Sequence, residues 1–184
     1  MGSIKHQQPV KLICGIFWTE TIGVSQILDV LQKTWGPIDS FGPIFPFNHT
    51  KYYDDEMGSD LEKQYVSFEN LVDIDTMPDI KILSNSLEKP FFADGKRHVN
   101  IDPGYIADAK LVMPTTKNLS HRVYIGKNIF ADLQLMYKKE SFQFTPWTFN
   151  DVREPLNIAF FNTVRATYME QLKLLRRTTL SKSD

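Results

Sequence analysis

The chain has 184 residues, 42% of them hydrophobic and 12% aromatic, and its 21 basic and 22 acidic side chains leave a formal net charge of −1. This length and composition are typical of a single globular domain with a sizeable core, and they exclude an intrinsically disordered chain. The charge balance argues against a general nucleic-acid binder, because proteins that neutralise phosphates usually carry a basic surplus.

The first quarter of the chain predicts a buried strand followed by an amphipathic helix. Residues 1–8 are polar, and we expect them to be disordered. Residues 10–18 are almost wholly apolar, which is typical of a strand covered on both faces. Apolar side chains at steps of three and four then predict a helix over residues 21–35, with a buried face of Val24, Ile27, Leu28, Leu31 and Trp35.

The second quarter predicts less regular elements. Residues 38–47 contain Pro43 and Pro46, so they form a strand only at a sheet edge or in broken pieces. Residues 62–68 predict a further strand. Asp75 or Thr76 is then expected to cap a second helix, whose buried face would be Ile80, Leu83 and Leu87.

The third quarter is typical of antiparallel sheet. A short strand at 99–101 is expected to run into a turn at Asp102-Pro103-Gly104, because this composition favours turns. Residues 110–113 and 122–125 predict two more strands. Gly126-Lys127-Asn128 fits a hairpin loop that leads into 129–137, the clearest period-two alternation in the chain.

The last quarter predicts a long helix that begins at Pro155 and packs on the sheet through Leu156, Phe160, Val164, Tyr168, Leu172 and Leu175. The order strand, helix, strand, strand, helix, strand over residues 10–101 matches a ferredoxin-like βαββαβ unit. We therefore predict one α+β domain over residues 1–184, in which an antiparallel hairpin and the long C-terminal helix extend that unit.

Cys14 is the one cysteine of the chain, which excludes an intrachain disulfide and a zinc site built from thiolates. We expect it to be a small core residue. A reducing, cytoplasmic location is the default expectation, and no stretch approaches the roughly 18 apolar residues of a membrane span. The sequence also lacks a phosphate-binding loop that ends in Gly-Lys-Ser/Thr and a Gly-x-Ser-x-Gly nucleophile motif.

Several short motifs resemble a known family when they are taken in order. They are Trp35-Gly36-Pro37-Ile38, Phe45-Pro46-Phe47, NIDPGYI from Asn100, SHRVYIG from Ser120, and Pro146-Trp147-Thr148. The chain resembles an uncharacterised prokaryotic family, domain of unknown function 4416, along its whole length. The resemblance implies a small prokaryotic protein and assigns no activity, cofactor or site residue.

A basic and hydroxyl-bearing cluster is the main candidate site, and it consists of Lys110, Thr115, Thr116, Lys117, His121 and Arg122. Arginine offers a planar fork for phosphate or carboxylate, lysine a point charge, and threonine hydroxyls orient further acceptor oxygens. Together these groups could hold an anionic small molecule such as a nucleotide, with Tyr105, Tyr124 and Trp147 available to stack on a base. The alternative is that the charges are solvated strand ends and the threonines only favour strands.

A second hypothesis is a hydrolase or transferase. His121 could act as general acid or base, because histidine as a residue type exchanges protons near neutral pH, while Asp102 could orient it or bind Mg²⁺ beside a phosphate. The structural alternatives are a hydrogen-bonded histidine and a carboxylate that caps a turn. The scattered histidines have no metal-ligand spacing, so no other cofactor is predicted. A third hypothesis is a module that dimerises through a sheet edge or the C-terminal helix and has no small-molecule site.

Overall fold

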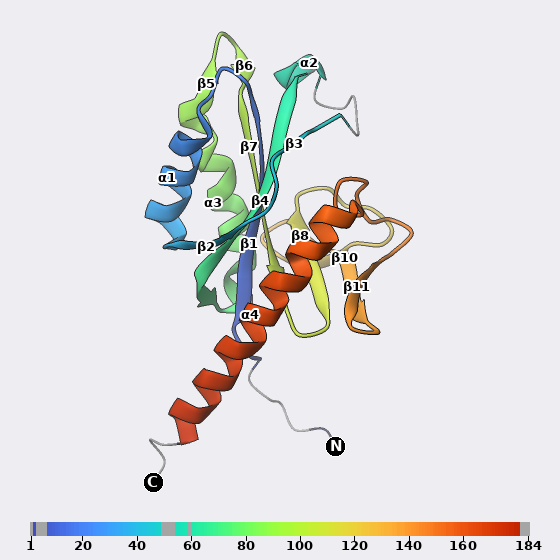
Figure 1. Ribbon diagram of the computed structural model, residues 1–184. Helices are drawn as coiled ribbons and strands as arrows, with labels where there is room; N and C mark the ends of the chain where they lie inside the picture. The colour runs from blue at the N-terminus through green and yellow to red at the C-terminus, as the bar shows by residue number, and fades with distance from the viewer. Residues whose placement is uncertain (1, 3–6, 49–53, 59, 181–184) are drawn as a thin grey trace.

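The computed structural model describes residues 2, 7–48, 54–58 and 60–180. Within these ranges the chain is an α+β protein with one large antiparallel sheet and a long C-terminal helix, as the sequence predicts (Figure 1). Residues 1 and 3–6 lie outside the described residues, so the disorder expected for 1–8 stays a prediction.

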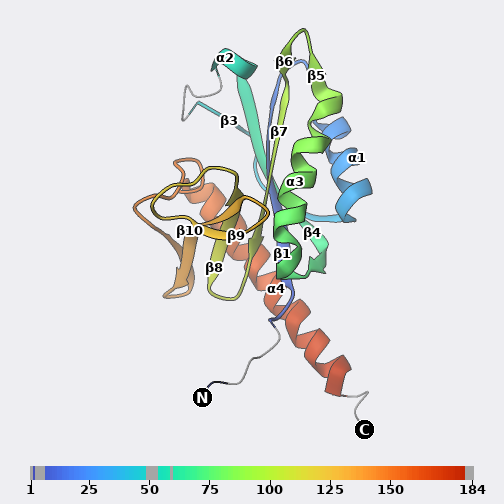
Figure 2. The same cartoon turned by 180° about the vertical axis from the view of Figure 1, so that it is seen from behind.

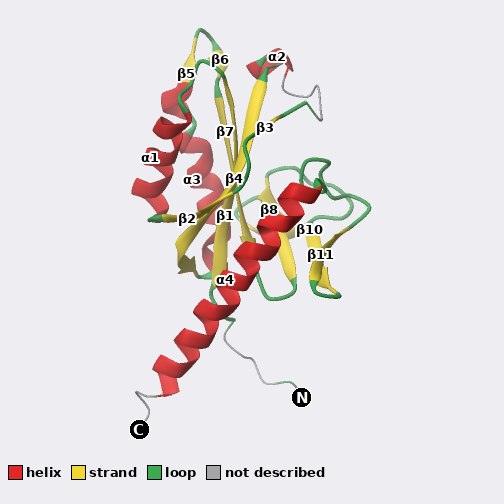
Figure 3. Cartoon of the chain, in the orientation of Figure 1, coloured by secondary structure: helices red, strands yellow, loops and turns green. Residues whose placement is uncertain are grey.

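The large sheet contains nine strands, and two short strands pair separately. The strands are β1 (Val10–Thr19), β2 (Ile38–Phe41), β3 (Phe45–Pro46), β4 (Leu61–Val72), β5 (Phe92–Ala93), β6 (Lys96–Arg97), β7 (Val99–Ile106), β8 (Lys110–Thr115), β9 (Val123–Gly126), β10 (Ile129–Lys138) and β11 (Ser141–Phe144). The helices are α1 (Val24–Trp35), α2 (Asp54–Met57), α3 (Met77–Leu87) and α4 (Pro155–Leu180) (Figure 3).

The order of the large sheet is β11-β10-β8-β7-β1-β4-β2, with β3 paired to β4 and β9 paired to β10. Neighbouring strands are antiparallel. The second strand of the prediction is broken into β2 and β3 beside one edge, as its prolines indicate. The apolar strand β1 lies centrally between β7 and β4, where it is buried along its full length.

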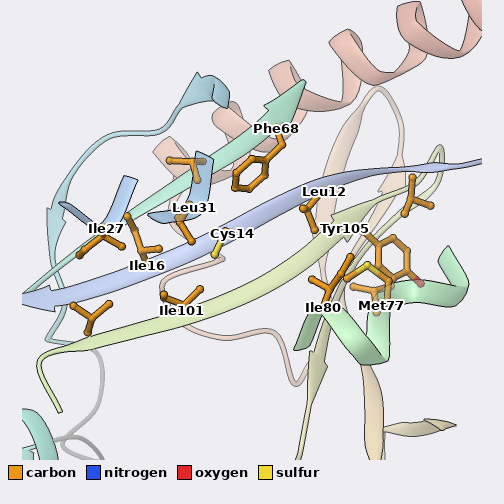
Figure 4. Close-up of a cluster of buried hydrophobic side chains, with 14 of the residues drawn as sticks. Leu12, Cys14, Ile16, Ile27, Leu31, Phe68, Met77, Ile80, Ile101 and Tyr105 are labelled. Carbon is orange, nitrogen blue, oxygen red and sulfur yellow. The ribbon is translucent and has the colours of Figure 1, made fainter. Parts of the chain in front are cut away.

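Helices cover both faces of the sheet. Helices α1 and α3 lie on one face and α4 crosses the other, as the two opposite views show (Figures 1 and 2). Alternate residues of β1 follow this division: Leu12, Cys14 and Ile16 join the core under α1 and α3 (Figure 4), whereas Ile13 joins the core under α4. Cys14 is therefore a buried core residue, as predicted.

Helix α3 differs from its prediction in both its cap and its buried face. The side chain of Asp73 accepts the capping bond from the backbone of Asp75 at the 3₁₀ turn η1 (Ile74–Thr76), so neither Asp75 nor Thr76 caps the helix with its side chain. Leu83 is 41% exposed, whereas Lys81 is buried. Helix α3 therefore packs on the sheet through a face that includes Lys81, whose ammonium group pairs with the half-buried carboxylate of Asp102.

Strand β7 corrects the prediction of a turn at Asp102-Pro103-Gly104, because these residues continue the strand. Thr19 donates its backbone N–H to His98, and from there the pairs along β1 and β7 alternate between bonded and non-bonded. By this alternation, the backbone nitrogen of Pro103 points away from β1. The missing N–H of proline therefore costs no bond to β1.

Two hairpins of the sheet are each closed by two residues with positive φ, although only the first hairpin was predicted. Lys127 and Asn128 both have positive φ and join β9 to β10, which confirms the predicted loop. Lys139 and Glu140 also have positive φ and join β10 to β11, a strand that was not predicted. It was missed because neither Lys nor Glu is a typical residue for a tight turn.

Helix α4 packs on the sheet through the middle of its predicted stripe. Phe160, Val164, Tyr168 and Leu172 are buried together with Phe161. The two ends of the predicted stripe, Leu156 and Leu175, are exposed. Figure 1 shows why for the C-terminal end, since the helix extends there beyond the strands.

Candidate functional site

A cavity of about 630 Å³ lies where the large sheet splits. Strands β7 and β8 pair only at Tyr105 with Val112 and at Ile106 with Leu111. Beyond these two pairs the strands separate, and the cavity fills the gap between them. Its lining consists of Phe17, Phe47, Glu56, Lys63, Lys81, Asn85, Arg97, Asn100, Asp102, Met113, Pro114, Thr115, Thr116, Lys117, Arg122, Trp147, Thr148, Phe149, Asn150 and Asp151.

The backbone of β7 explains why the sheet divides at this point. Ile101 donates its backbone N–H to the carboxylate of Glu88 over 2.8 Å, so a side chain takes the place of a neighbouring strand. Pro103 has no N–H to offer. At Gly104 a Cβ atom would lie 2.9 Å from the carbonyl oxygen of Val112, so only glycine permits the close crossing of β7 and β8.

The floor of the cavity lies on two rows of residues across β4, β1 and β7, and four of them line it, namely Lys63, Phe17, Asn100 and Asp102. Residues directly opposite each other on paired strands point to the same face. The register places Lys63, Phe17 and Asn100 in one row, and Tyr65, Gly15 and Asp102 in the next. A Cβ atom on Gly15 would lie 2.8 Å from the ring of Tyr65, so glycine leaves room for that ring to lie across β1.

Lys63 and Asp151 form a buried ion pair in this floor, with 2.7 Å between Nζ and Oδ2. The Tyr65 hydroxyl donates to the same carboxylate oxygen. The ammonium group also lies 4.6 Å from the ring centroid of Phe47 and 5.3 Å from that of Phe17. Burial raises the pKa of Asp151, but Lys63 and Tyr65 outweigh it and hold that pKa below its ordinary value.

A second ion pair joins α3 to β7. Lys81 Nζ donates to Asp102 Oδ1 over 2.7 Å, and Asn100 Nδ2 donates to Asp102 Oδ2 over 2.7 Å. Burial raises the pKa of Asp102 and lowers that of Lys81, but their mutual attraction outweighs burial in both groups. The pKa of Asp102 is therefore lowered and that of Lys81 raised, so both stay charged near neutral pH.

Arg97 extends this network from Asn100 to two further carboxylates. Its Nη1 donates to Glu88 over 3.1 Å and to Asn100 over 2.9 Å, and its Nη2 donates to Glu56 over 3.1 Å. Burial raises the pKa of Glu88, although the bond from Ile101 and the charge of Arg97 oppose that shift. The cations and carboxylates on this side of the cavity therefore largely neutralise each other.

The opposite wall is built from two loops. The basic loop, residues 115–122, is closed by Arg122, whose Nη1 donates to the carbonyl of Lys117 over 2.9 Å and whose Nε donates to Asp132 over 2.7 Å. Asp132 is fully buried. Thr115, Thr116 and Lys117 of this loop line the cavity.

The aromatic loop, residues 145–151, completes this wall. Trp147 donates its indole N–H to the carbonyl of Leu133 over 2.7 Å, and Thr148 and Phe149 both bond to Gln134 of β10. Arg153 donates to three carbonyl oxygens of the loop, those of Thr145, Pro146 and Thr148. Many bonds thus fix a loop that still exposes large rings at the cavity.

His121 connects the two loops. Its ring stacks on the indole of Trp147 with 5.2 Å between centroids and 18° between planes. Its Nε2 lies 3.6 Å from Asp132 Oδ2, too far for a hydrogen bond. Buried His121 Nε2 and Asp132 Oδ1 have no hydrogen-bond partner among the described residues.

The structure brings together some of the residues predicted from the sequence. Asp102, Thr115, Thr116, Lys117 and Arg122 line the same cavity. His121 contacts the lining through Trp147. The acidic group beside His121 is Asp132, whereas Asp102 bonds to Lys81 and Asn100.

Three of the predicted ligand-binding residues lie away from the cavity lining. Lys110 pairs with Met136 at the opposite end of β8, five residues and about 16 Å of strand from Thr115. Tyr105 is buried in the core under α3. Tyr124 is exposed on β9, where its ring contacts Phe130.

The sequence analysis missed the cations and the carboxylate of the floor, namely Lys63, Lys81 and Asp151. Alternation in β4 gave a signal for Lys63, because it places this lysine on the same face as Leu61 and Tyr65. Lys81 and Asp151 gave none: the first is not among the apolar residues that predicted the buried face of its helix, and the second lies in an irregular segment.

Two general features bear on possible ligands. Among the described residues, no group of three or more His, Cys, Asp and Glu side chains is arranged to hold a metal ion. None of the helices in the described part of the chain combines the length and the apolar character needed to cross a bilayer.

Comparison with known proteins identifies a family and no activity. The chain has no match among curated proteins or among solved structures. Residues 8–168 match a family described as domain of unknown function (DUF4416), and this match includes both loops and every strand of the cavity. The chain therefore belongs to the DUF4416 family.

Proposed function

We propose that the cavity binds an anionic small molecule, such as a nucleotide or another phosphate-like compound. A volume of about 630 Å³ lies within the range of roughly 300–1,000 Å³ that is usual for small-molecule sites. Among the described residues, five cationic side chains and three carboxylates line it: Lys63, Lys81, Arg97, Lys117 and Arg122, with Glu56, Asp102 and Asp151. Two further carboxylates, Glu88 and Asp132, pair with Arg97 and Arg122, so these charges nearly balance. The observation that carries the proposal is therefore the exposed Lys117 beside Thr115 and Thr116 in a concave site.

The basic loop is the part of the cavity that suits an anion best. Lys63 and Lys81 each pair with a carboxylate of the floor. Lys117 is exposed and lines the cavity beside the hydroxyls of Thr115 and Thr116. Ammonium and hydroxyl groups side by side can donate several hydrogen bonds to phosphate oxygens.

The test compares charge reversals at two lysines: Lys110 at the start of β8, and Lys117 in the basic loop at the other end of this strand. AMP, ribose 5-phosphate and inorganic triphosphate are titrated by calorimetry into the wild type, Lys117→Glu and Lys110→Glu. Both variants change the net charge equally, but only Lys117 lines the cavity. We expect Lys117→Glu to weaken binding by about tenfold or more, since hydrogen bonds to charged groups contribute about 1.5–3 kcal/mol, and Lys110→Glu to have little effect. Equal effects of the two variants, or no binding by any of the three anions, would contradict the proposal.

A second candidate function is acid–base catalysis by His121 on the bound anion. The position of its Nε2, 3.6 Å from the buried Asp132, favours it, because a carboxylate near an imidazole can orient the ring for proton transfer. His121→Asn would then abolish turnover of a bound phosphate ester without a ring, such as ribose 5-phosphate, while that compound still binds. An inactive wild type, assayed over a panel of phosphate esters that do bind, would contradict this candidate.

We also infer that β1, α1, β2, β4, α3 and β7 form a ferredoxin-like unit. Counted along the chain, the order β7-β1-β4-β2 reads fourth, first, third, second, and all neighbours are antiparallel. Helices after the first and third strands lie on one face (Figure 2), which also supports the assignment. An experimental structure with a different strand order would contradict it.

A further inference from the structure

The aromatic loop presents two large rings that the other described residues leave partly exposed. Trp147 and Phe149 line the cavity, and each is 38% exposed. An exposed ring on a mobile segment would carry little information, because single exposed apolar residues are common. These rings belong instead to a segment that is fixed at several points.

The restraints on this loop hold both the backbone and the indole. The indole N–H of Trp147 is bonded to Leu133, and the backbone N–H of Phe149 is bonded to the side chain of Gln134, which is itself buried. One face of the indole is stacked on His121. A ring that is already oriented loses little conformational entropy when a ligand binds, which is the usual reason for such preorganisation.

We propose that the ligand carries a flat aromatic ring in addition to its anionic group, and that this ring stacks in the aromatic loop on Trp147 and Phe149. This inference rests on the proposed anion site, and it specifies the class of ligand. His121 acts as a positioning residue, because it holds the indole from its other side. The ring and the anionic group then contact neighbouring parts of one wall, the first the aromatic loop and the second the basic loop.

The test uses phosphate compounds with and without a ring. AMP, GMP and FMN carry a flat ring, whereas ribose 5-phosphate carries a comparable phosphate and no ring. Calorimetric titration of the wild type should give a dissociation constant for at least one of the ring-bearing compounds that is about 5- to 150-fold lower than that of ribose 5-phosphate, as expected for stacking of one base.

Variants of Trp147 and Phe149 test whether their rings cause the preference for ring-bearing compounds. Trp147→Leu should abolish the preference for ring-bearing compounds and leave the affinity for ribose 5-phosphate unchanged. Because this variant also removes the bond to Leu133, Phe149→Leu provides a second measurement in which the backbone bond to Gln134 remains. Tyr124→Leu is the matched control: its ring is 58% exposed but lies outside the cavity lining, and we expect no change.

The possible outcomes separate this inference from the proposed function. If ribose 5-phosphate binds as tightly as AMP, GMP and FMN, and both loop variants behave like the wild type, the anion site stands and the stacking inference is wrong. If none of the four compounds binds, the proposed function fails, and the stacking inference fails with it. The stacking inference would also be wrong if Tyr124→Leu abolished the preference for ring-bearing compounds and the two loop variants did not.

Discussion

The two sides of the cavity differ in how their polar groups are used. The floor, made by β4, β1 and β7, carries buried charges that pair with each other or with a neighbouring element, as in Lys63 with Asp151 and Lys81 with Asp102. The wall of the basic and aromatic loops carries exposed groups on a fixed backbone, such as Lys117, Trp147 and Phe149. The comparison teaches that charge in a cavity does not by itself mark a ligand contact. Paired charges of the floor mainly hold elements together, whereas the exposed groups of the wall are accessible to a ligand.

Loss of the ion pair between Lys63 and Asp151 should cause the largest change in stability of the variants that test this contrast between floor and wall. Lys63→Met leaves the Asp151 carboxylate buried without its cation, and loss of one partner of a buried pair costs about 3–5 kcal/mol. We expect a fall of that size in the free energy of unfolding, measured by urea denaturation. Lys33→Met, at an exposed position of α1, is the control, and its effect should stay within about 0.5 kcal/mol.

A double variant distinguishes loss of the pair from simple loss of packing. Asp151→Asn keeps an oxygen that can accept the hydrogen bond from Tyr65. Lys63→Met combined with Asp151→Asn should be less destabilised than the sum of the two single variants, because neither charge is then left alone. Strict additivity would show that the pair does not act as a unit.

The crossing of β7 and β8 provides a second test, because it joins the floor to the wall. Gly104→Ala places a methyl group 2.9 Å from the backbone carbonyl of Val112 and 2.3 Å from the sulfur of Met113. We expect a loss of about 1–3 kcal/mol in the free energy of unfolding, as is usual for overpacking in a core. A variant as stable as the wild type would mean that the strands do not cross so closely.

The dependence of the free energy of unfolding on pH in the acid range tests the ion pairs of Asp102 and Asp151. The pKa of Asp102 and that of Asp151 are lowered in the folded protein, because the attraction of Lys81 and Lys63 outweighs burial. The unfolded chain therefore takes up protons first. The stabilisation is complete above the ordinary pKa of about 3.9 and is lost as the pH falls below it.

Two other groups beside the cavity, Glu88 and Lys81, act in the opposite direction. The raised pKa of Glu88, caused first by burial, gives a contribution that is present at low pH and is lost as the pH rises through the folded pKa. The raised pKa of Lys81 gives stability that is lost above its ordinary value of about 10.4. In urea titrations at a series of pH values, Asp102→Asn should reduce the acid sensitivity of the wild type, and an unchanged pH dependence would contradict the pairing with Lys81.

The wall should respond least in stability. Lys117→Glu is expected to change the free energy of unfolding by no more than about 0.5 kcal/mol, because the residue is exposed. Its effect on binding of an anion is the readout described above. If Lys117→Glu destabilised the fold as much as Lys63→Met does, there would be no distinction in stability between floor and wall.

Much of the fold was predictable from local pattern. The apolar run of β1, the stripe of α1 and α4, and the alternation of β10 each follow from which residues must avoid water. The basic loop was also found in outline, since Thr115, Thr116, Lys117 and Arg122 are close in sequence and remain close in space. Local spacing was misleading for Lys110, because an extended strand carries it away from the loop.

The sequence by itself determined an α+β chain with a central apolar strand, a long packing helix and a basic, hydroxyl-bearing segment, because these features depend on neighbours within a few residues. The tertiary structure alone decided where the sheet splits, that Lys81 lies inside, and that Lys63, Asp102 and Asp151 share one floor with the loops opposite them. The physical reason is register. Residues far apart in the chain share a face only once strand pairing has fixed which of them lie opposite each other, and a buried charge is tolerated only where that pairing supplies its partner.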